Sequence, residues 1–279
     1  MTSPADPIAA FYGARSEAER LERGIGRLEA VRTFELLGRY LPPAPAVICD
    51  VGGGTGFYAR WLTERGYTVH LIDMVPAHVE AARTHRPAPA SASIGDARRL
   101  PWPDASADAV LLMGPLYHLS ERTDRICALV EARRVLRREG VLFGVIIPRW
   151  ASTLIGMLRG WTFDDAYAAM VRGEITTGRH VPPDGWSLFM DGFFHSTEDL
   201  QSETRQAGFE IRTLAAIEGP AWMSHDFDIA WEDPHKRHRL LELSRLAEQD
   251  ASIIAASPHV AFVAKAAGLE CESDDAANA

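Results

Sequence analysis

Residues 47–56 have the sequence VICDVGGGTG, which is the most informative segment of the chain. An apolar run ends in Asp50, and Gly52, Gly54 and Gly56 follow at alternate positions before a helical pattern begins. Glycine is needed where a turn is tight and where backbone must approach a ligand without a Cβ in the way. The helix start that follows presents unpaired N–H groups and the positive end of its dipole. The stretch therefore predicts a strand, a turn and a helix that together bind a nucleotide-like ligand.

The same turn leaves two kinds of enzyme open. Residues 54–59, GTGFYA, fit the G-x-G-x-x-G/A pattern of dinucleotide-binding proteins. An NAD(P)-dependent oxidoreductase is therefore the alternative function. Residues further along the chain have to distinguish it from an enzyme that binds another nucleotide-like ligand.

Around this unit, apolar runs alternate with helical patterns, which is typical of parallel strands joined by crossover helices. The runs are nearly all apolar, so we expect the sheet to be covered on both faces. Strands are expected over residues 46–50, 68–73, 91–95, 108–113, 141–147, 209–217 and 260–264. Helices are expected over residues 57–65, from Pro76 onward, and over 121–139, 196–207 and 235–248.

Two further acidic residues stand at the ends of predicted strands. Asp73 ends the second strand, where a carboxylate can accept hydrogen bonds from ribose hydroxyls, in NAD enzymes as in others. Asp96 follows the third strand, where a carboxylate can accept from an adenine amino group. Because parallel strands end at one edge of a sheet, we expect Asp50, Asp73 and Asp96 to share one rim.

This combination resembles the class I S-adenosylmethionine (SAM) dependent methyltransferases over about residues 30–265. The matching elements are DVGGGTG, HLID, GDA, LLMGPLYHL, GFEI and HVAFVAKA. The resemblance implies a Rossmann-like α/β fold, a seven-stranded, mostly parallel sheet with helices on both faces, in which an antiparallel last strand inserts beside the sixth. It also implies SAM as cofactor and methyl transfer to an O or N atom of a small organic molecule, such as a natural-product or other secondary-metabolism acceptor. A SAM-binding protein without catalytic activity is a further alternative.

The resemblance assigns roles in binding the cofactor. Asp50 would form a hydrogen bond near the amino group of SAM. The backbone of the glycine turn would lie against the methionine part of SAM. Asp73 would hold the ribose. The other implied contacts are Met74, Asp96 and Ala97 at the adenine, and Met113 with Gly114 at the methionyl part. Tyr12, Arg20 or Arg32 could meet the carboxylate of SAM, and ion pairs with Glu17 or Glu29 are the alternative for the arginines.

Methyl transfer from a sulfonium is an in-line displacement, so the enzyme mainly aligns the nucleophile and excludes water. A base helps only when the nucleophile carries a proton of high pKa. His118 follows the fourth strand and is the first candidate for that base, and His195 is the second; helix capping or packing is the alternative for both. Tyr117 could donate a hydrogen bond or form the pocket wall, and we favour the wall.

The strand–helix alternation stops after residue 148, and aromatic residues become frequent. We expect five segments: an N-terminal helical cover (1–40), the SAM-binding core (41–148), an inserted lid for substrate (149–195), the C-terminal part of the core (196–268) and a flexible tail (269–279). The aromatic residues predict an apolar or aromatic acceptor, or else serve as the core of a small subdomain. They are Trp150, Trp161, Phe163, Trp186, Phe189, Phe193, Phe194 and Trp222.

Charge and cysteine content narrow the partners. The 279 residues carry a net charge of −9, and residues 151–279 alone carry 10 Lys+Arg and 21 Asp+Glu, so nucleic acid is not expected as a substrate and an amine acceptor is slightly favoured. No apolar run is long enough for a membrane span, and no signal peptide is recognised. The spacing of Cys49, Cys127 and Cys271 fits a reducing cytoplasm. No third ligand accompanies His235 and His238, so no metal is expected.

Overall fold

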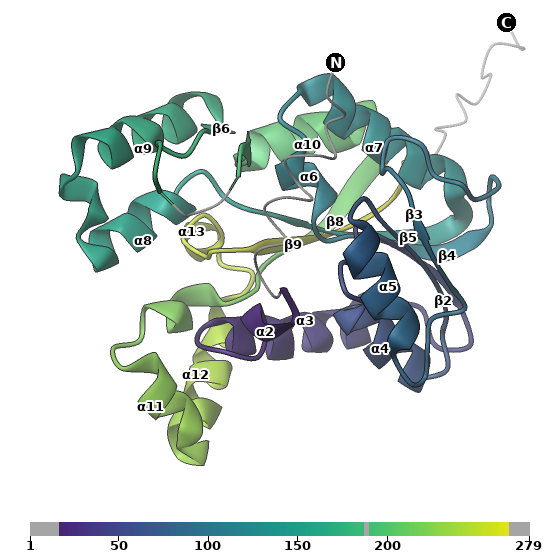
Figure 1. Cartoon of the computed structure of the whole chain (residues 1–279), viewed down its shortest axis with the longest axis horizontal. Helices are drawn as coiled ribbons and strands as arrows, with labels where there is room; N and C mark the ends of the chain where they lie inside the picture. The colour runs from purple at the N-terminus through teal and green to yellow at the C-terminus, as the bar shows by residue number, and fades with distance from the viewer. Residues whose placement is uncertain (1–16, 187–189, 268–279) are drawn as a thin grey trace, which may run out of the picture.

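A computed structural model describes residues 17–186 and 190–267, and the centre of this part is a seven-stranded sheet (Figure 1). The strand order is β3-β2-β1-β4-β5-β9-β8, and β9 runs antiparallel to both of its neighbours. This confirms the predicted fold, including the last strand inserted beside the sixth. The sheet strands are β1 (Val47–Val51), β2 (Thr68–Asp73), β3 (Ser91–Ile94), β4 (Ala107–Leu112), β5 (Leu136–Ile146), β8 (Phe209–Ala216) and β9 (Val260–Ala266).

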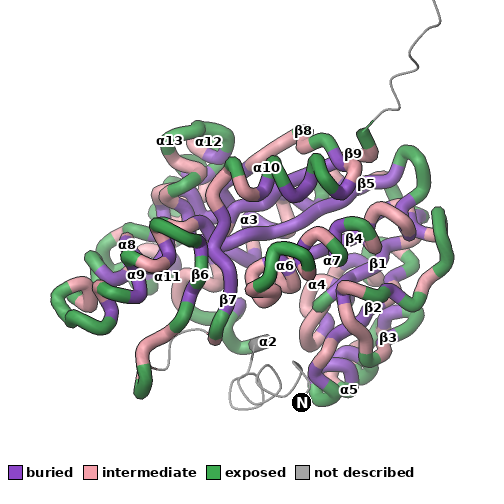
Figure 2. The backbone as a smooth tube through the Cα atoms, turned by 90° about the horizontal axis from the view of Figure 1, so that it is seen from above, coloured by how far each residue is buried: buried purple, intermediate pink, exposed green. Residues whose placement is uncertain are grey.

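Helices cover both faces of the sheet because successive strand residues point to opposite sides. On β4, Val110 and Leu112 pack toward one helical layer, whereas Ala109 and Leu111 pack toward the other. The first layer holds α7 (Arg122–Val135) and α10 (Thr197–Gln206). The second holds α3 (Gly26–Tyr40), α4 (Phe57–Glu64) and α5 (Pro76–Thr84). Figure 2 shows the inner strands, such as β4 and β5, mostly in the colour of buried residues, whereas the edge strand β8 carries intermediate and exposed residues.

One predicted boundary is wrong. The helix expected over residues 121–139 ends at Val135, and β5 begins at Leu136. Leu136 is buried and pairs with Ala107 of β4, so burial of this side chain draws the chain into the sheet before the arginines that follow. Gly140 is therefore not a helix cap. It allows a close approach, because a Cβ there would lie 2.8 Å from a methyl carbon of Leu136.

Other local signals act as predicted. Ser196 and Asp199 form a capping box at the start of α10, with each side chain accepting from the backbone of the other. Gly66 and Gly208 follow α4 and α10 with φ of +85° and +80°, the left-handed conformation that ends a helix.

Two insertions follow strands of the central sheet without adding strands to it. Residues after β5 form a lobe of two α-helices, one 3-10 helix and an antiparallel pair of short strands: α8 (Ala151–Arg159), η1 (Trp161–Phe163), α9 (Asp165–Thr177), β6 (Arg179–His180) and β7 (Gly192–Phe193). The sequence predicted an insertion here but not its helices. A second insertion joins β8 to β9 and contains η2 (Gly219–Met223), α11 (Phe227–Glu232), α12 (Pro234–Ala247) and α13 (Ala251–Ile254). The helix expected over residues 235–248 corresponds to α12.

The second insertion packs on the N-terminal helices, α2 (Glu17–Arg20) and α3 (Figure 1). Leu28 of α3 shares a buried apolar cluster with Phe227 and Trp231 of α11. Arg27 forms ion pairs with Asp228 and Glu232 across the same contact. None of the helices in the described ranges is long and apolar enough to cross a membrane. The expected tail, 269–279, lies outside the described residues.

Candidate active site

A pocket lies at the edge of the sheet where the parallel strands end. One half is formed by the turns after β1, β2, β3 and β4. The other half lies at the ends of β5 and β8 and the start of β9, against α2 and α3. The pocket brings together most of the predicted site residues: Asp50, Gly52, Gly54, Asp73, Met74, Asp96, Ala97, Met113, Gly114, Tyr117 and His118.

The glycine turn after β1 is held by the end of β2. The amides of Gly52 and Gly53 donate to the carbonyl of Ile72 at 2.8 and 3.2 Å, and the amide of Gly54 donates to Asp73 Oδ2 at 2.8 Å. A Cβ on Gly53 would lie 2.6 Å from Asp50 Oδ2, so the close approach of these two residues requires glycine. Gly53 was not singled out from the sequence, although it stands inside the GGG run.

Asp50 is buried at the end of β1 and faces the pocket. Burial, together with the charge of Asp73, raises the pKa of Asp50 to about 7. Its Oδ2 atom has no hydrogen-bond partner among the described residues. A buried carboxylate oxygen without a hydrogen-bond partner is well suited to accept from a cationic N–H group of a ligand.

The other two strand-end acids are already partly engaged. Asp73 Oδ1 accepts from the amide of Val75 at 2.8 Å and lies 3.2 Å from His78 Nδ1. Asp96 is bound by the side chain and the amide of Arg98. Burial raises the pKa of Asp96, but the hydrogen bonds from Arg98 outweigh it and hold the pKa below its usual value. Both residues present carboxylate oxygens at the pocket wall.

The short helix α6 (Pro115–His118) follows β4 and carries two candidates. The Tyr117 hydroxyl donates to the carbonyl of Met113 at 2.8 Å, which suits a wall residue. Burial lowers the pKa of His118 to about 4, partly offset by Asp73, so its imidazole is neutral at physiological pH.

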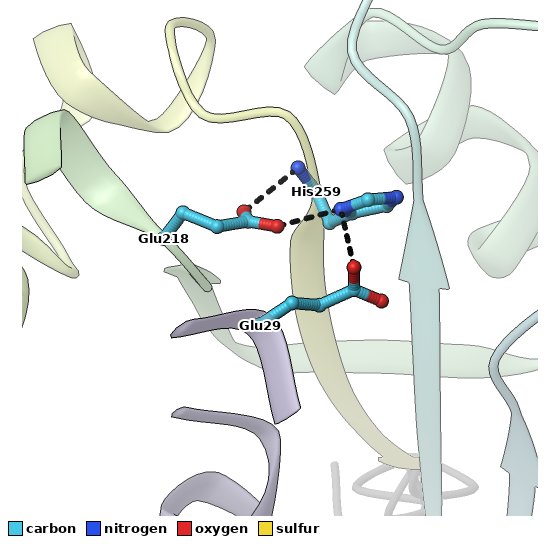
Figure 3. Close-up of side chains that lie close together, drawn as sticks. All are labelled: Glu29, Glu218 and His259. Carbon is cyan, nitrogen blue, oxygen red and sulfur yellow. Dashed lines mark hydrogen bonds and ion pairs between the residues drawn. The ribbon is translucent and has the colours of Figure 1, made fainter. Parts of the chain in front are cut away.

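The far half of the pocket holds a cluster that the sequence analysis missed (Figure 3). His259 Nδ1 lies 2.7 Å from Glu218 Oε1 and 3.7 Å from Glu29 Oε2. Arg20 binds both oxygens of Glu29, at 2.5 and 2.9 Å. In the sequence, Glu29 is expected only as an ion-pair partner of an arginine. His259 precedes the last strand, whereas the sequence signals for site residues lie after strands.

The opposite charges of Glu29 and His259 each stabilise the charged form of the other. Burial raises the pKa of Glu29, but Arg20 and His259 outweigh it and hold the value at about 2. Burial lowers the pKa of His259, but Glu29 and Glu218 outweigh it and raise the value to about 9. At neutral pH, His259 is therefore an imidazolium between two carboxylates.

Three predicted or candidate residues of the described chain are not in the pocket lining. Gly56 caps α4 with φ +82° and packs against Ala82 instead. Arg32 is fully buried and binds Glu35, Glu248 and the carbonyl of Ile217, so it does not meet a ligand carboxylate. His195 lies outside the pocket lining. Tyr12 lies outside the described residues.

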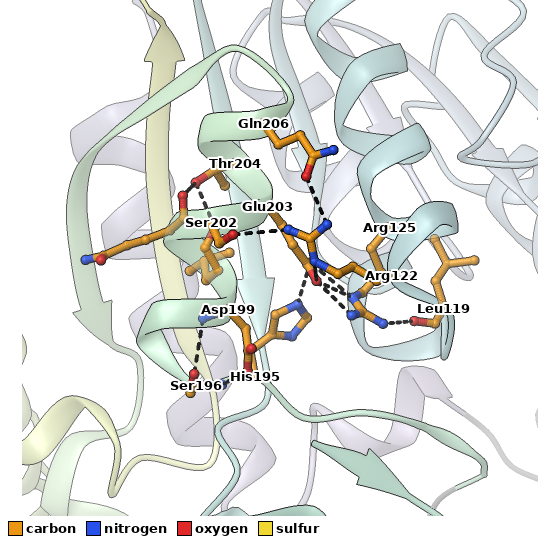
Figure 4. A network of polar contacts seen from close by, with 12 residues as sticks. Leu119, Arg122, Arg125, His195, Ser196, Asp199, Ser202, Glu203, Thr204 and Gln206 are labelled. Atoms are coloured by element: carbon orange, nitrogen blue, oxygen red, sulfur yellow. Dashed lines mark hydrogen bonds and ion pairs between the residues drawn. The ribbon is translucent and has the colours of Figure 1, made fainter. Parts of the chain in front are cut away.

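His195 belongs instead to a buried network (Figure 4). Its Nε2 lies 3.3 Å from Glu203, which also accepts from Arg125 at 2.7 Å. Arg125 donates to the carbonyls of Leu119 and Ser120, just after α6. Burial lowers the pKa of His195, with Glu203 partly offsetting the effect. The network therefore joins α10 to the loop that follows His118.

The aromatic residues expected to hold the substrate serve mainly as packing in the described part of the chain. Trp161 and Trp186 pack edge-on, and both contact Tyr167 in the core of the α8–α9 lobe. Trp222 is buried and donates to the carbonyl of Ala256. Phe163 is 91% exposed. The aromatic side chains of the pocket are Phe57, Tyr58 and Tyr117.

Comparison with known proteins identifies the family of the chain. A family described as "Methyltransferase domain" matches residues 49–144. A demethylmenaquinone methyltransferase of Deinococcus radiodurans is 32% identical over 192 residues, 66% of this chain and 76% of that protein. The chain belongs to the class I SAM-dependent methyltransferases. This methyltransferase therefore uses SAM, and the oxidoreductase alternative is set aside.

Two further comparisons bear on the methyltransferase. A malonyl-[acyl-carrier protein] O-methyltransferase of Serratia marcescens is 32% identical over 130 residues, 47% of this chain and 47% of that protein. A SAM-dependent methyltransferase of Methanosarcina mazei has a solved structure with TM-score 0.58 at 17% identity, covering 84% of this chain and 98% of that one. The latter similarity supports the fold.

Proposed function

We propose that this methyltransferase transfers the methyl group of SAM to an O or N atom of a small organic molecule, and that the acceptor occupies the far half of the pocket. The observation that carries the proposal is the continuity of one pocket from Asp50, Asp73 and Asp96 to the cluster of Glu29 and His259. The first half offers acids for the cofactor. The second offers hydrogen-bonding side chains for another molecule.

The residues of the first half fit SAM. The unpartnered Oδ2 of Asp50 would accept from its ammonium group, and Asp73 from its ribose hydroxyls. A Cβ on Gly54 would meet nothing within 4 Å, so its backbone borders open space next to Asp73. Met74, Asp96 and Ala97 would surround the adenine, and Met113 with Gly114 the methionyl part. Bound SAM supplies an electrophilic methyl group on a sulfonium.

The chain's own contribution is mainly orientation and exclusion of water. Tyr117 forms part of the wall, with its hydroxyl held by Met113. His118 is neutral and can accept a hydrogen bond from the acceptor, but its low pKa makes it a weak base. His195 would act through the network that holds the loop after His118.

The acceptor half also has an apolar wall. Leu21, Val145 and Ile217 line it, and Tyr58 contributes a ring. These residues support an acceptor with an apolar body, which is also the expectation from the sequence. They are not the aromatic residues after β5 on which that expectation is based. The free thiols of Cys49 and Cys127 support the cytoplasmic location proposed from the cysteine pattern.

Radiolabelled methyl transfer tests this function. The full chain would be incubated with methyl-labelled SAM and panels of small carboxylic acids, phenols, alcohols and amines. Label should appear in a small organic product and S-adenosylhomocysteine (SAH) should form. Transfer of label only to protein or nucleic acid would contradict the proposal. Thermal shift with SAH and NADH checks the cofactor separately, because a ligand specific to the native state raises the melting temperature.

A further inference from the structure

His259 stands at the acceptor end of the pocket with one ring nitrogen fixed and the other open. Nδ1 faces Glu218 and Glu29, and Figure 3 shows Nε2 pointing away from both carboxylates. No hydrogen bond to Nε2 occurs within the described part of the chain, and His259 lines the pocket. The ring is thus oriented from behind, with a donor atom left for a ligand.

The carboxylates behind His259 are not available to a ligand. Both oxygens of Glu29 are bound by Arg20, and Glu218 accepts from Ser257 and from the amide and ring of His259. The acidic side chains of this region are therefore neutralised inside the cluster. Among the described residues of the cluster, His259 presents its Nε2–H to the pocket, and the cationic side chain of Arg20 also lines it.

We infer that His259 is an acceptor-binding residue that donates a hydrogen bond from Nε2, and that the site takes an acceptor with an anionic oxygen, such as a carboxylate, enolate or phenolate. This inference rests on the proposed function. It narrows the methylated atom from O or N to the oxygen of an acidic group. It also reverses the slight preference for an amine that the acidic second half of the sequence suggested.

The chemistry of the pocket agrees with an acceptor that is already ionised. His118 is too weak a base to deprotonate an alcohol, and His259 already carries its proton. When a carboxylate is the nucleophile, one of its oxygens forms the new O–CH3 bond as the S–CH3 bond breaks. The negative charge of the acceptor and the positive charge of the sulfonium cancel, and no proton has to be removed.

A metal ion is the other reading of this cluster, since Glu29, Glu218 and His259 place ligand atoms within 4.8 Å of one another. Arg20 on both oxygens of Glu29 argues against it, because a guanidinium in that position repels a cation. A proton on His259 Nδ1 satisfies the same carboxylates.

The test uses two probes of the same shape and opposite charge, benzoate and benzylamine, with acetate and methylamine as smaller equivalents. They are titrated into the SAH-bound full chain, and the imidazole nitrogens of His259 are followed by 15N NMR. We expect saturable binding of a carboxylate that shifts the Nε2 resonance, and at least tenfold weaker binding of its amine partner. Saturable shifts by the amines, no saturable shift by either carboxylate, or a shift on adding Zn²⁺ would overturn the inference.

Two variants separate a specific role from a structural one. His259→Phe removes the donor and should weaken binding of the carboxylate about tenfold, as expected for loss of a charged hydrogen bond. Glu218→Gln keeps the size of its side chain but removes a charge behind the ring, and should lower the pKa of His259 measured by NMR. In both, SAH affinity should stay within about twofold of wild type. Unchanged carboxylate affinity in the folded His259→Phe protein would refute the role of His259, whereas failure to methylate any small molecule would refute the proposed function.

Discussion

The carboxylate of Asp73 accepts a hydrogen bond from the amide of Gly54 at 2.8 Å, so the end of β2 fixes the turn that follows β1. The same carboxylate binds the amide of Val75 and faces His78. The residue proposed to hold the ribose therefore also sets the shape of the glycine turn beside it.

Asp73→Asn should weaken SAH binding by roughly 10- to 100-fold, because an amide nitrogen cannot accept from Gly54 and the charged acceptor for the ribose is lost. Isothermal titration calorimetry measures the change. Asp104→Asn is a matched control at an exposed ion pair with Arg134, and should leave the affinity unchanged. Equal affinities of the two variants would contradict the role of Asp73.

Cofactor binding should release protons near neutral pH. Burial and Asp73 raise the pKa of Asp50 to about 7, so the carboxyl is partly protonated there, and an ammonium group beside it would lower that pKa. SAH affinity should then fall as the pH drops below 7. Calorimetry in buffers of different ionisation enthalpy measures the proton release, and Asp50→Asn should abolish it. Release that is unchanged in this variant would assign the proton to another group.

The pH dependence of stability should report on His259. Its pKa is raised to about 9 by Glu29 and Glu218 against the opposing effect of burial, while Arg20 opposes the two carboxylates. The interaction of protonated His259 with Glu29 and Glu218 therefore stabilises the fold fully below pH 6.5. This stabilisation is lost as the pH rises through about 9. The full effect is of the order of 3 kcal/mol. Urea unfolding of wild type and His259→Gln should differ at pH 6.5 and converge by pH 10, with His225→Gln, an exposed histidine, as control.

Arg32→Met should destabilise the fold by about 3–5 kcal/mol, because it leaves the largely buried Glu248 without one of its cationic partners. Its SAH affinity should remain close to wild type, since Arg32 is absent from the pocket lining. Denaturant unfolding and calorimetry on the same preparation check both statements. A folded, stable variant that has lost SAH binding would restore Arg32 as a candidate for the cofactor carboxylate.

The meeting of Asp50, Asp73 and Asp96 at one pocket could be predicted from sequence because the signals are local. Each of Asp50, Asp73 and Asp96 follows its own apolar run, and the direction of parallel strands brings them to one rim. The error at Leu136 shows the limit of such signals. Helical periodicity continued past this residue, but its pairing with Ala107, a tertiary contact, determined where the strand begins.

The acceptor half could not be predicted in the same way. Glu29 belongs to α3, Glu218 follows β8 and His259 precedes β9, so their contact depends on how the second insertion packs on the N-terminal helices. His195 was misleading for the opposite reason. It stands beside aromatic residues in the sequence, yet its bond to Glu203 draws it into the interior.

The reversed direction of β9 has a consequence for how sequences of this kind are read. In a parallel strand the chain reaches the binding rim on leaving the sheet, whereas in β9 it arrives there on entering it. Changes in length or composition between residues 217 and 259 can therefore reshape the part of the pocket near His259, which is the proposed acceptor site, without changing the turns after β1, β2 and β3. Polar positions just ahead of a reversed closing strand are where related chains should be searched for substrate preference.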